Sequence, residues 1–90
     1  MSHIVKRGVN RVEPYQREKL HSSIQTACLS VRTLEGEAET TAREVCKKVE
    51  NWLEDRLEVT SADIRRKAAQ ALHIYNPEAA IVYKDEKELA

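Results

Sequence analysis

Residues 5–24 read VKRGVNRVEPYQREKLHSSI, and this stretch decides how we expect the chain to fold. Segment 8–10 contains a glycine and an asparagine, which both tolerate positive φ, so it predicts a tight turn between two strands. Pro14 cannot donate a hydrogen bond to a sheet, so the second strand is expected to end there. From Gln16 onward, apolar residues recur with the period of one helical face. The stretch therefore predicts a β-hairpin, with strands at 3–6 and 11–13, that leads directly into a helix.

Three later segments show the same helical spacing of apolar residues. Together the four stripes predict helices at 16–31, 38–57, 62–75 and 77–89. Residues 57–60 predict a third strand beside the hairpin, and 33–37 predict a loop. Four aligned stripes can form a bundle, and short strands can cover one end of it. The expected fold is α+β but mainly α: a four-helix bundle capped by a small three-stranded β-sheet, in one domain spanning residues 1–90 whose charged tail frays from about residue 85.

Two of the predicted helices begin with recognisable capping residues. Residues 60–63 (TSAD) place a hydroxyl before the helix and an acid three residues later, which is the pattern of a capping box. Residues 76–78 (NPE) combine an asparagine cap, a proline and an acid. At 65–67 (RRK), three cations crowd the positive end of a helix. They indicate either a nearby anion or pairing with Asp63 and with acids of the preceding helix.

The charge balance limits the classes of partner. The 90-residue chain has 15 basic and 15 acidic residues, so its formal net charge is zero. Domains that bind nucleic acids or anionic membranes are usually basic overall, so we expect neither partner. No apolar run approaches the ~20 residues of a membrane span, and the N-terminus lacks the apolar core of a signal peptide. A cytoplasmic location is therefore expected.

The cysteines and histidines show no spacing typical of a metal site. Cys28 and Cys46 fall within predicted helices and are expected to be reduced, buried and apolar in character, with a disulfide or a metal site as the minor alternative. His3, His21 and His73 are scattered along the chain. No nucleophile, zinc-protease or phosphate-loop motif is present. We therefore expect neither a bound metal nor an enzyme, and no catalytic residues.

Several residues near the hairpin suit an anionic ligand. Lys6 and Arg7 lie on the hairpin, Lys19 in the first turns of the following helix, and Thr60 and Ser61 at a later helix start. A hydroxyl and free N–H groups at a helix start suit a phosphate oxygen. Lysine provides a point charge for phosphate, and arginine a bidentate fork. The pattern indicates a local anion site despite the zero net charge.

Other residues allow two interpretations. Glu13 either accepts a hydroxyl or amine group of a ligand or forms a surface ion pair with Arg11 or Arg17. Trp52 is expected to anchor the core rather than to stack on a ligand. The polar face of the 38–57 helix is expected to be solvated; its charged residues are Lys47, Lys48, Glu50, Glu54 and Asp55.

Three groups of residues, in order along the chain, resemble the ATP-cone domain. The first comprises VKR at 5–7, VEPY at 12–15, REKL at 17–20, SI at 23–24 and AC at 27–28. The others are VTS at 59–61 with DI at 63–64, and NPEAA at 76–80 with Tyr83. The family's members are allosteric sensors of ATP and dATP in the large subunits of ribonucleotide reductases and in a repressor of reductase genes. The resemblance implies the same bundle-and-sheet fold.

The resemblance also implies a nucleotide-binding site. In it, residues between Glu13 and Lys19 would line the base, ribose and phosphates, and a hydroxyl at the start of the 62–75 helix would cap a phosphate. Three features differ from the family pattern: the turn after Arg7 is one residue longer, Gln16 stands where the family often has Asp or Asn, and the last helix is short. The implied site residues are Val5, Lys6, Arg7, Glu13, Tyr15, Gln16, Lys19, Thr60, Ser61 and Arg65.

We therefore expect a free-standing ATP-cone that acts as a regulatory module. Its ligand would be ATP or dATP, with or without Mg²⁺, and its output would be control of self-association or of a partner protein. The alternative is a cone that has lost its nucleotide and serves as a helical protein–protein or DNA-associated interaction module.

Overall fold

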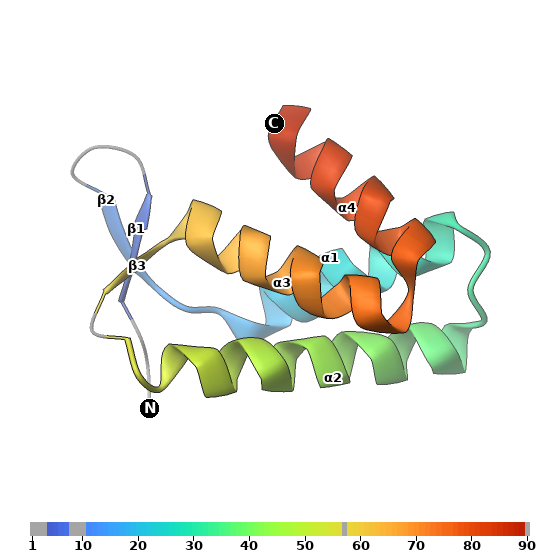
Figure 1. The fold of residues 1–90 in the computed structure, drawn as a ribbon, viewed down its shortest axis with the longest axis horizontal. Coiled ribbons are helices and arrows are strands. Elements are labelled where there is room, and N and C mark those ends of the chain that lie inside the picture. The colour runs from blue at the N-terminus through green and yellow to red at the C-terminus, as the bar shows by residue number, and fades with distance from the viewer. Residues whose placement is uncertain (1–3, 8–10, 57, 90) are drawn as a thin grey trace.

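A computed structural model describes residues 4–7, 11–56 and 58–89 of the chain, with side chains described for 15–56 and 58–85 (Figure 1). The expectation of a mainly helical chain is confirmed. The predicted turn at 8–10 and the predicted strand residue His3 lie outside the described residues. The elements are β1 (Ile4–Arg7), β2 (Arg11–Pro14), α1 (Arg17–Ser30), α2 (Glu35–Leu53), β3 (Val59–Thr60), α3 (Ser61–Tyr75) and α4 (Pro77–Leu89).

The strands gather at one end of the helices, where α3 begins (Figure 1). The strand order is β2–β1–β3. β1 pairs antiparallel with β2, which places Val5 opposite Glu13. It also pairs in parallel with the two residues of β3, so that Val5 lies beside Val59 and Lys6 beside Thr60. This register brings the N-terminal strand next to the start of α3, although more than 50 residues separate them in the sequence.

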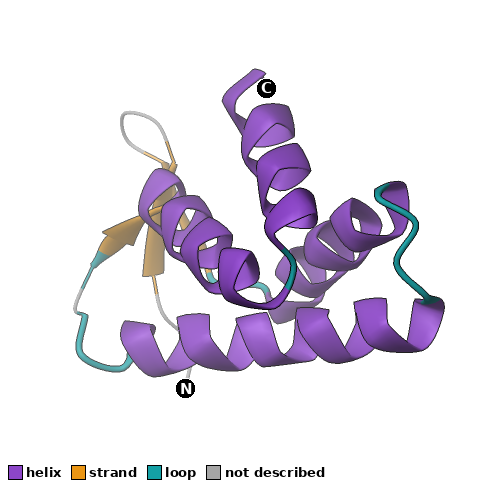
Figure 2. Ribbon diagram, turned by 45° about the vertical axis from the view of Figure 1, so that its right-hand side comes forward, coloured by secondary structure: helices purple, strands orange, loops and turns teal. Residues whose placement is uncertain are grey.

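The helices pack so that α1 and α3 each contact both α2 and α4 (Figure 2). Their apolar stripes meet in one core. Among the described residues outside the helices, only Val59 is a buried member of this core. Many core positions hold alanine, so the helix backbones approach closely and few large side chains fill the interior. Tyr75, the last residue of α3, is 42% exposed. The largest fully buried side chains include Ile24, Leu53, Leu72 and Tyr83.

The prediction for α2 was wrong at both ends. The helix begins at Glu35, so residues 35–37 of the predicted loop are helical. Glu35 and Glu37 lie in its first turn, where carboxylates interact favourably with the positive end of the helix dipole. The helix ends at Leu53 rather than at 57, because the chain turns at 54–55 before entering β3.

The end of α1 is a Schellman motif without glycine. The Arg32 N–H donates to the Leu29 carbonyl at 3.0 Å, and the Thr33 N–H donates to the Cys28 carbonyl at 3.1 Å. These are the two bonds of the motif, and Arg32 holds the left-handed position with φ of 64°. The motif ends the helix at Ser30, one residue before the predicted boundary.

Both predicted capping patterns are confirmed. Thr60 and Asp63 form a reciprocal capping box at the start of α3. At the start of α4, the Asn76 Oδ1 atom accepts from the Ala79 N–H at 3.1 Å. The Asn76 amide also donates to Thr33 Oγ1 at 2.9 Å, which ties the α1–α2 loop to the α3–α4 turn. Among the described helices, none is long and apolar enough to cross a membrane.

Candidate functional site

The sheet register places several of the predicted site residues around the start of α3. Lys6 lies beside Thr60, and Ser61 is the first residue of α3. Val5 lies between Glu13 and Val59 across the sheet. Arg7, opposite Arg11, ends β1. The structure describes the residues of β1 and β2 by backbone position alone, so ligand contacts of their side chains stay predictions.

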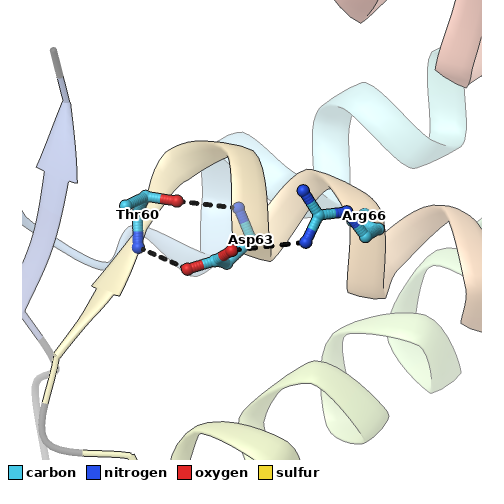
Figure 3. Close-up of polar contacts among 3 residues, drawn as sticks. All are labelled: Thr60, Asp63 and Arg66. Carbon is cyan, nitrogen blue, oxygen red and sulfur yellow. Dashed lines mark hydrogen bonds and ion pairs between the residues drawn. The ribbon is translucent and has the colours of Figure 1, made fainter.

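At the start of α3, Thr60 and Asp63 form hydrogen bonds with each other (Figure 3). Thr60 Oγ1 accepts from the Asp63 N–H at 3.0 Å, and the Asp63 carboxylate accepts from the Thr60 N–H at 3.1 Å. The first N–H groups of a helix have no partner within the helix, so that of Ala62 is available as a donor to a ligand. The Thr60 hydroxyl can also still donate its proton. These donors suit an anion that approaches the first turn.

Asp63 is the acidic member of this helix start. The Thr60 backbone N–H and hydroxyl hold the pKa of the Asp63 carboxyl below its ordinary value, and Arg66 acts in the same direction. Arg66 lies 3.4 Å from the Asp63 carboxylate. The interpretation of the 65–67 cations as partners of Asp63 is therefore confirmed for Arg66, which partly balances the carboxylate.

Arg65 lies on a different side of α3 from Arg66. The Arg65 side chain is half-buried and lies near Tyr83 of α4. Burial raises the pKa of the Tyr83 hydroxyl to about 12, and the charge of Arg65 acts in the opposite direction. A cation one turn into α3, directed towards α4, adds positive potential near the helix start. Its predicted contact with phosphate stays a prediction.

The start of α1 differs from that of α3 because no side chain caps it. Gln16 occupies the N-cap position, and its side chain makes no capping hydrogen bond. Lys19 is exposed in the first turn. Free N–H groups and an exposed ammonium group directly after β2 form a second place where a phosphate oxygen can be bound.

Tyr15 and Arg17, on either side of Gln16, are both held by Glu50 of α2. The Tyr15 hydroxyl donates to Glu50 Oε2 at 3.1 Å, and Arg17 Nε lies 3.1 Å from the same oxygen. Burial raises the pKa of the Tyr15 hydroxyl, and the negative charge of Glu50 acts in the same direction. In this structure Tyr15 therefore supports the fold through its contacts with Glu50 and the core.

Sequence reasoning missed Glu50 because it treated the polar face of α2 as solvated. That expectation fits Lys47, Glu54 and Asp55, which are exposed, but Glu50 is half-buried and bound to two partners. Arg17, considered as a partner of Glu13, pairs with Glu50. Trp52 lies at the edge of the core rather than within it, with the Arg56 guanidinium 4.9 Å from its ring centre.

The described residues contain no group of three histidine, cysteine, aspartate or glutamate side chains that could hold a metal ion. Cys28 and Cys46 are buried and unlinked, as expected, and burial raises the pKa of both thiols. In the part of the chain whose side chains are described, every buried side-chain nitrogen and oxygen has a hydrogen-bond partner. The N–H, hydroxyl and cationic groups at the starts of α1 and α3 are of the kinds that can bind an anion.

Comparison with known families agrees with this geometry. The family model of the ATP cone domain matches residues 2–89, so the chain belongs to the ATP-cone family. Searches of curated proteins and of solved structures find no significant match. The family is one of nucleotide-sensing regulatory domains, and its domains bind ATP or dATP in general.

Proposed function

We propose that this chain is a regulatory module that binds ATP or dATP where the sheet meets the starts of α1 and α3. The observation that carries the proposal is the register that sets Lys6 beside Thr60 at the start of α3. Membership of the ATP-cone family, over nearly the whole chain, supports the same assignment.

Each group of predicted residues has a role in this site. The phosphates, with or without Mg²⁺, would be held by the N–H group of Ala62 and by the cations around it. Glu13 would accept a hydroxyl or amine group of the ribose or base, beside Val5, Tyr15 and Gln16. The proposed phosphate-binding side chains are Lys6, Arg7, Lys19, Thr60, Ser61 and Arg65.

A nucleotide in this position would join the sheet to two helices. Binding would stabilise one arrangement of β1 and β2 against α1 and α3, and a ligand shifts a conformational equilibrium by its difference in affinity for the two states. We propose that the output is a change in self-association or in binding to a partner protein, in the cytoplasm, rather than catalysis.

Calorimetric titration with ATP and with dATP tests the proposal. The double variant Lys6→Ala/Lys19→Ala removes one cation from each side of the site and should abolish binding while helix content is retained. The control Lys47→Ala/Lys48→Ala removes the same charge from the exposed surface of α2 and should bind as the wild type does. Unchanged affinity in the first double variant would mean that the nucleotide site lies elsewhere.

A protein-interaction module is the second candidate, and the outer surface of α3 favours it. Grooves run between α2 and α3 and between α3 and α4; their described linings include Lys48, Lys67 and Lys84 but no acid. Ile74 and Ile81, one in each groove, are 71% and 61% exposed. If this candidate is correct, Ile74→Glu/Ile81→Glu should abolish an association seen by sedimentation, with or without nucleotide. A gel shift with duplex DNA at low salt would instead indicate a DNA-associated module.

A further inference from the structure

We infer that Glu50 is a positioning residue that holds the β2–α1 junction in the geometry that nucleotide binding requires. This inference rests on the proposed function, because it assigns a role to a residue outside the proposed site. Its basis is one carboxylate oxygen, Glu50 Oε2, that takes two donors from the junction, each at 3.1 Å.

The two donors bracket the first residues of α1. Tyr15 follows the last residue of β2, and Arg17 is the first residue of α1. Gln16, the N-cap residue between them, has no capping bond of its own to fix the helix start. Helix α2 therefore fixes the β2–α1 junction through Glu50, in place of a capping bond at Gln16.

Three proposed site residues depend on this junction for their position. Gln16 lies between the two anchored residues, Glu13 precedes Tyr15 by two positions, and Lys19 follows Arg17 by two positions. Displacements of about 1 Å in a binding site are enough to weaken contacts substantially. Loss of the Glu50 contacts should therefore reduce nucleotide affinity although Glu50 itself does not touch the ligand.

The Tyr15–Glu50 hydrogen bond differs from an ordinary surface contact. Tyr15 is half-buried and packs against the core, whereas the Glu50 and Arg17 side chains are 34% and 46% exposed. A hydrogen bond to a carboxylate that is partly shielded from water contributes more than a solvated one, and the exposed Arg17 contact contributes less. The Lys47–Glu44 pair on the same helix is more exposed and connects no second element, so it provides a matched comparison.

The test compares Glu50→Ala with Glu44→Ala, which removes the same charge and breaks an ion pair of the same helix. Titration with ATP should show binding weakened by about 2- to 30-fold for Glu50→Ala, the range expected for a residue coupled to a site. The control should match the wild type. Glu50→Gln keeps an oxygen that accepts from both donors and should fall between the two.

Double variants distinguish a positioning role of Glu50 in the nucleotide site from a general contribution to the stability of the fold. If Glu50 acts through the α1 side of the site, its effect on ATP affinity should be non-additive with Lys19→Ala and additive with Arg65→Ala, on α3. Additivity with both would contradict the positioning role. If Glu50→Ala does not fold, Arg17→Ala removes one of the two contacts at a residue outside the proposed site and permits the same comparison.

Hydrogen exchange tests the anchor without any nucleotide. The Leu20 N–H donates to the Gln16 carbonyl at 3.3 Å in the first bond of α1, and the Ala80 N–H makes the corresponding bond to Asn76 in α4. Glu50→Ala should speed exchange at Leu20 but not at Ala80. Unchanged exchange at Leu20 would overturn the inference, whereas absence of ATP binding by the wild type would overturn only the proposed function.

Discussion

At the scale of single residues, Asp63 shows how one side chain serves both fold and site. It caps α3 through Thr60 and leaves the N–H group of Ala62 for a ligand. It also places a carboxylate next to the proposed phosphates, and Arg66 lies close enough to balance it. The same helix start can therefore be stable without nucleotide and still attract an anion.

The capping role of Asp63 predicts a pH-dependent stability. Folding lowers the pKa of this carboxyl from its ordinary value of 3.8, so its charge stabilises the fold above that pH and the benefit is lost as pH falls through the folded-state pKa. Thermal melts should show Asp63→Asn less stable than the wild type at pH 7, with the difference shrinking as the pH falls below 3.8. A difference that stays constant across this range would contradict the role of the charge.

The contrast between Asp63 and Glu50 also explains what could be predicted from sequence. Asp63 and Asn76 act on residues three positions away, so their patterns are visible in the chain. Tyr15 and Glu50 are separated by 35 positions, and no local pattern connects them. A distant partner of this kind becomes visible only once α1 and α2 are packed together.

At the scale of elements, the termini of the helices are where sequence and structure differ most. The acidic stretch before α2 suits a loop and a first helical turn equally well, so composition alone could not locate Glu35 as the start. The end of α1 was located to within one residue, but its Schellman motif was not foreseen because arginine occupies the position usually held by glycine. Helix interiors were predicted better because their apolar stripes extend over several turns.

The left-handed arginine predicts a stabilising substitution. Arg32→Gly should raise the free energy of unfolding by about 1 kcal/mol, because a side chain at positive φ is strained and glycine is not. Urea unfolding would measure the change. Thr26→Gly, at an exposed position inside α1, provides the control and should destabilise the chain. A loss of stability in Arg32→Gly would mean that the arginine makes contacts that outweigh the strain.

At the scale of the whole molecule, the two ends of the helices have different characters. The sheet and the starts of α1 and α3 lie at one end, with the proposed nucleotide site (Figure 1). Leu29, Leu34 and Tyr75, all exposed by 40% or more, lie towards the opposite end, where Asn76 binds Thr33. The alanine-rich core between them brings the helices close together.

The small core makes each large side chain important for stability. Ile24 is fully buried in α1, and Ile24→Ala should lower the free energy of unfolding by about 2–5 kcal/mol. That loss is a large part of the stability expected of a domain this small. Ile81→Ala removes the same atoms from a side chain that is 61% exposed and should change stability little. Equal effects in chemical denaturation would contradict the assignment of the core.

The most direct test of nucleotide binding at the sheet end is an amide chemical-shift titration of the wild-type chain with ATP. We predict shifts concentrated at Ser61 and Ala62 and at residues 16–19, which saturate together. Ile74 and Ile81, in the grooves beside α3, should not respond. Absence of any shift at saturating ATP, or shifts confined to the grooves, would contradict the account.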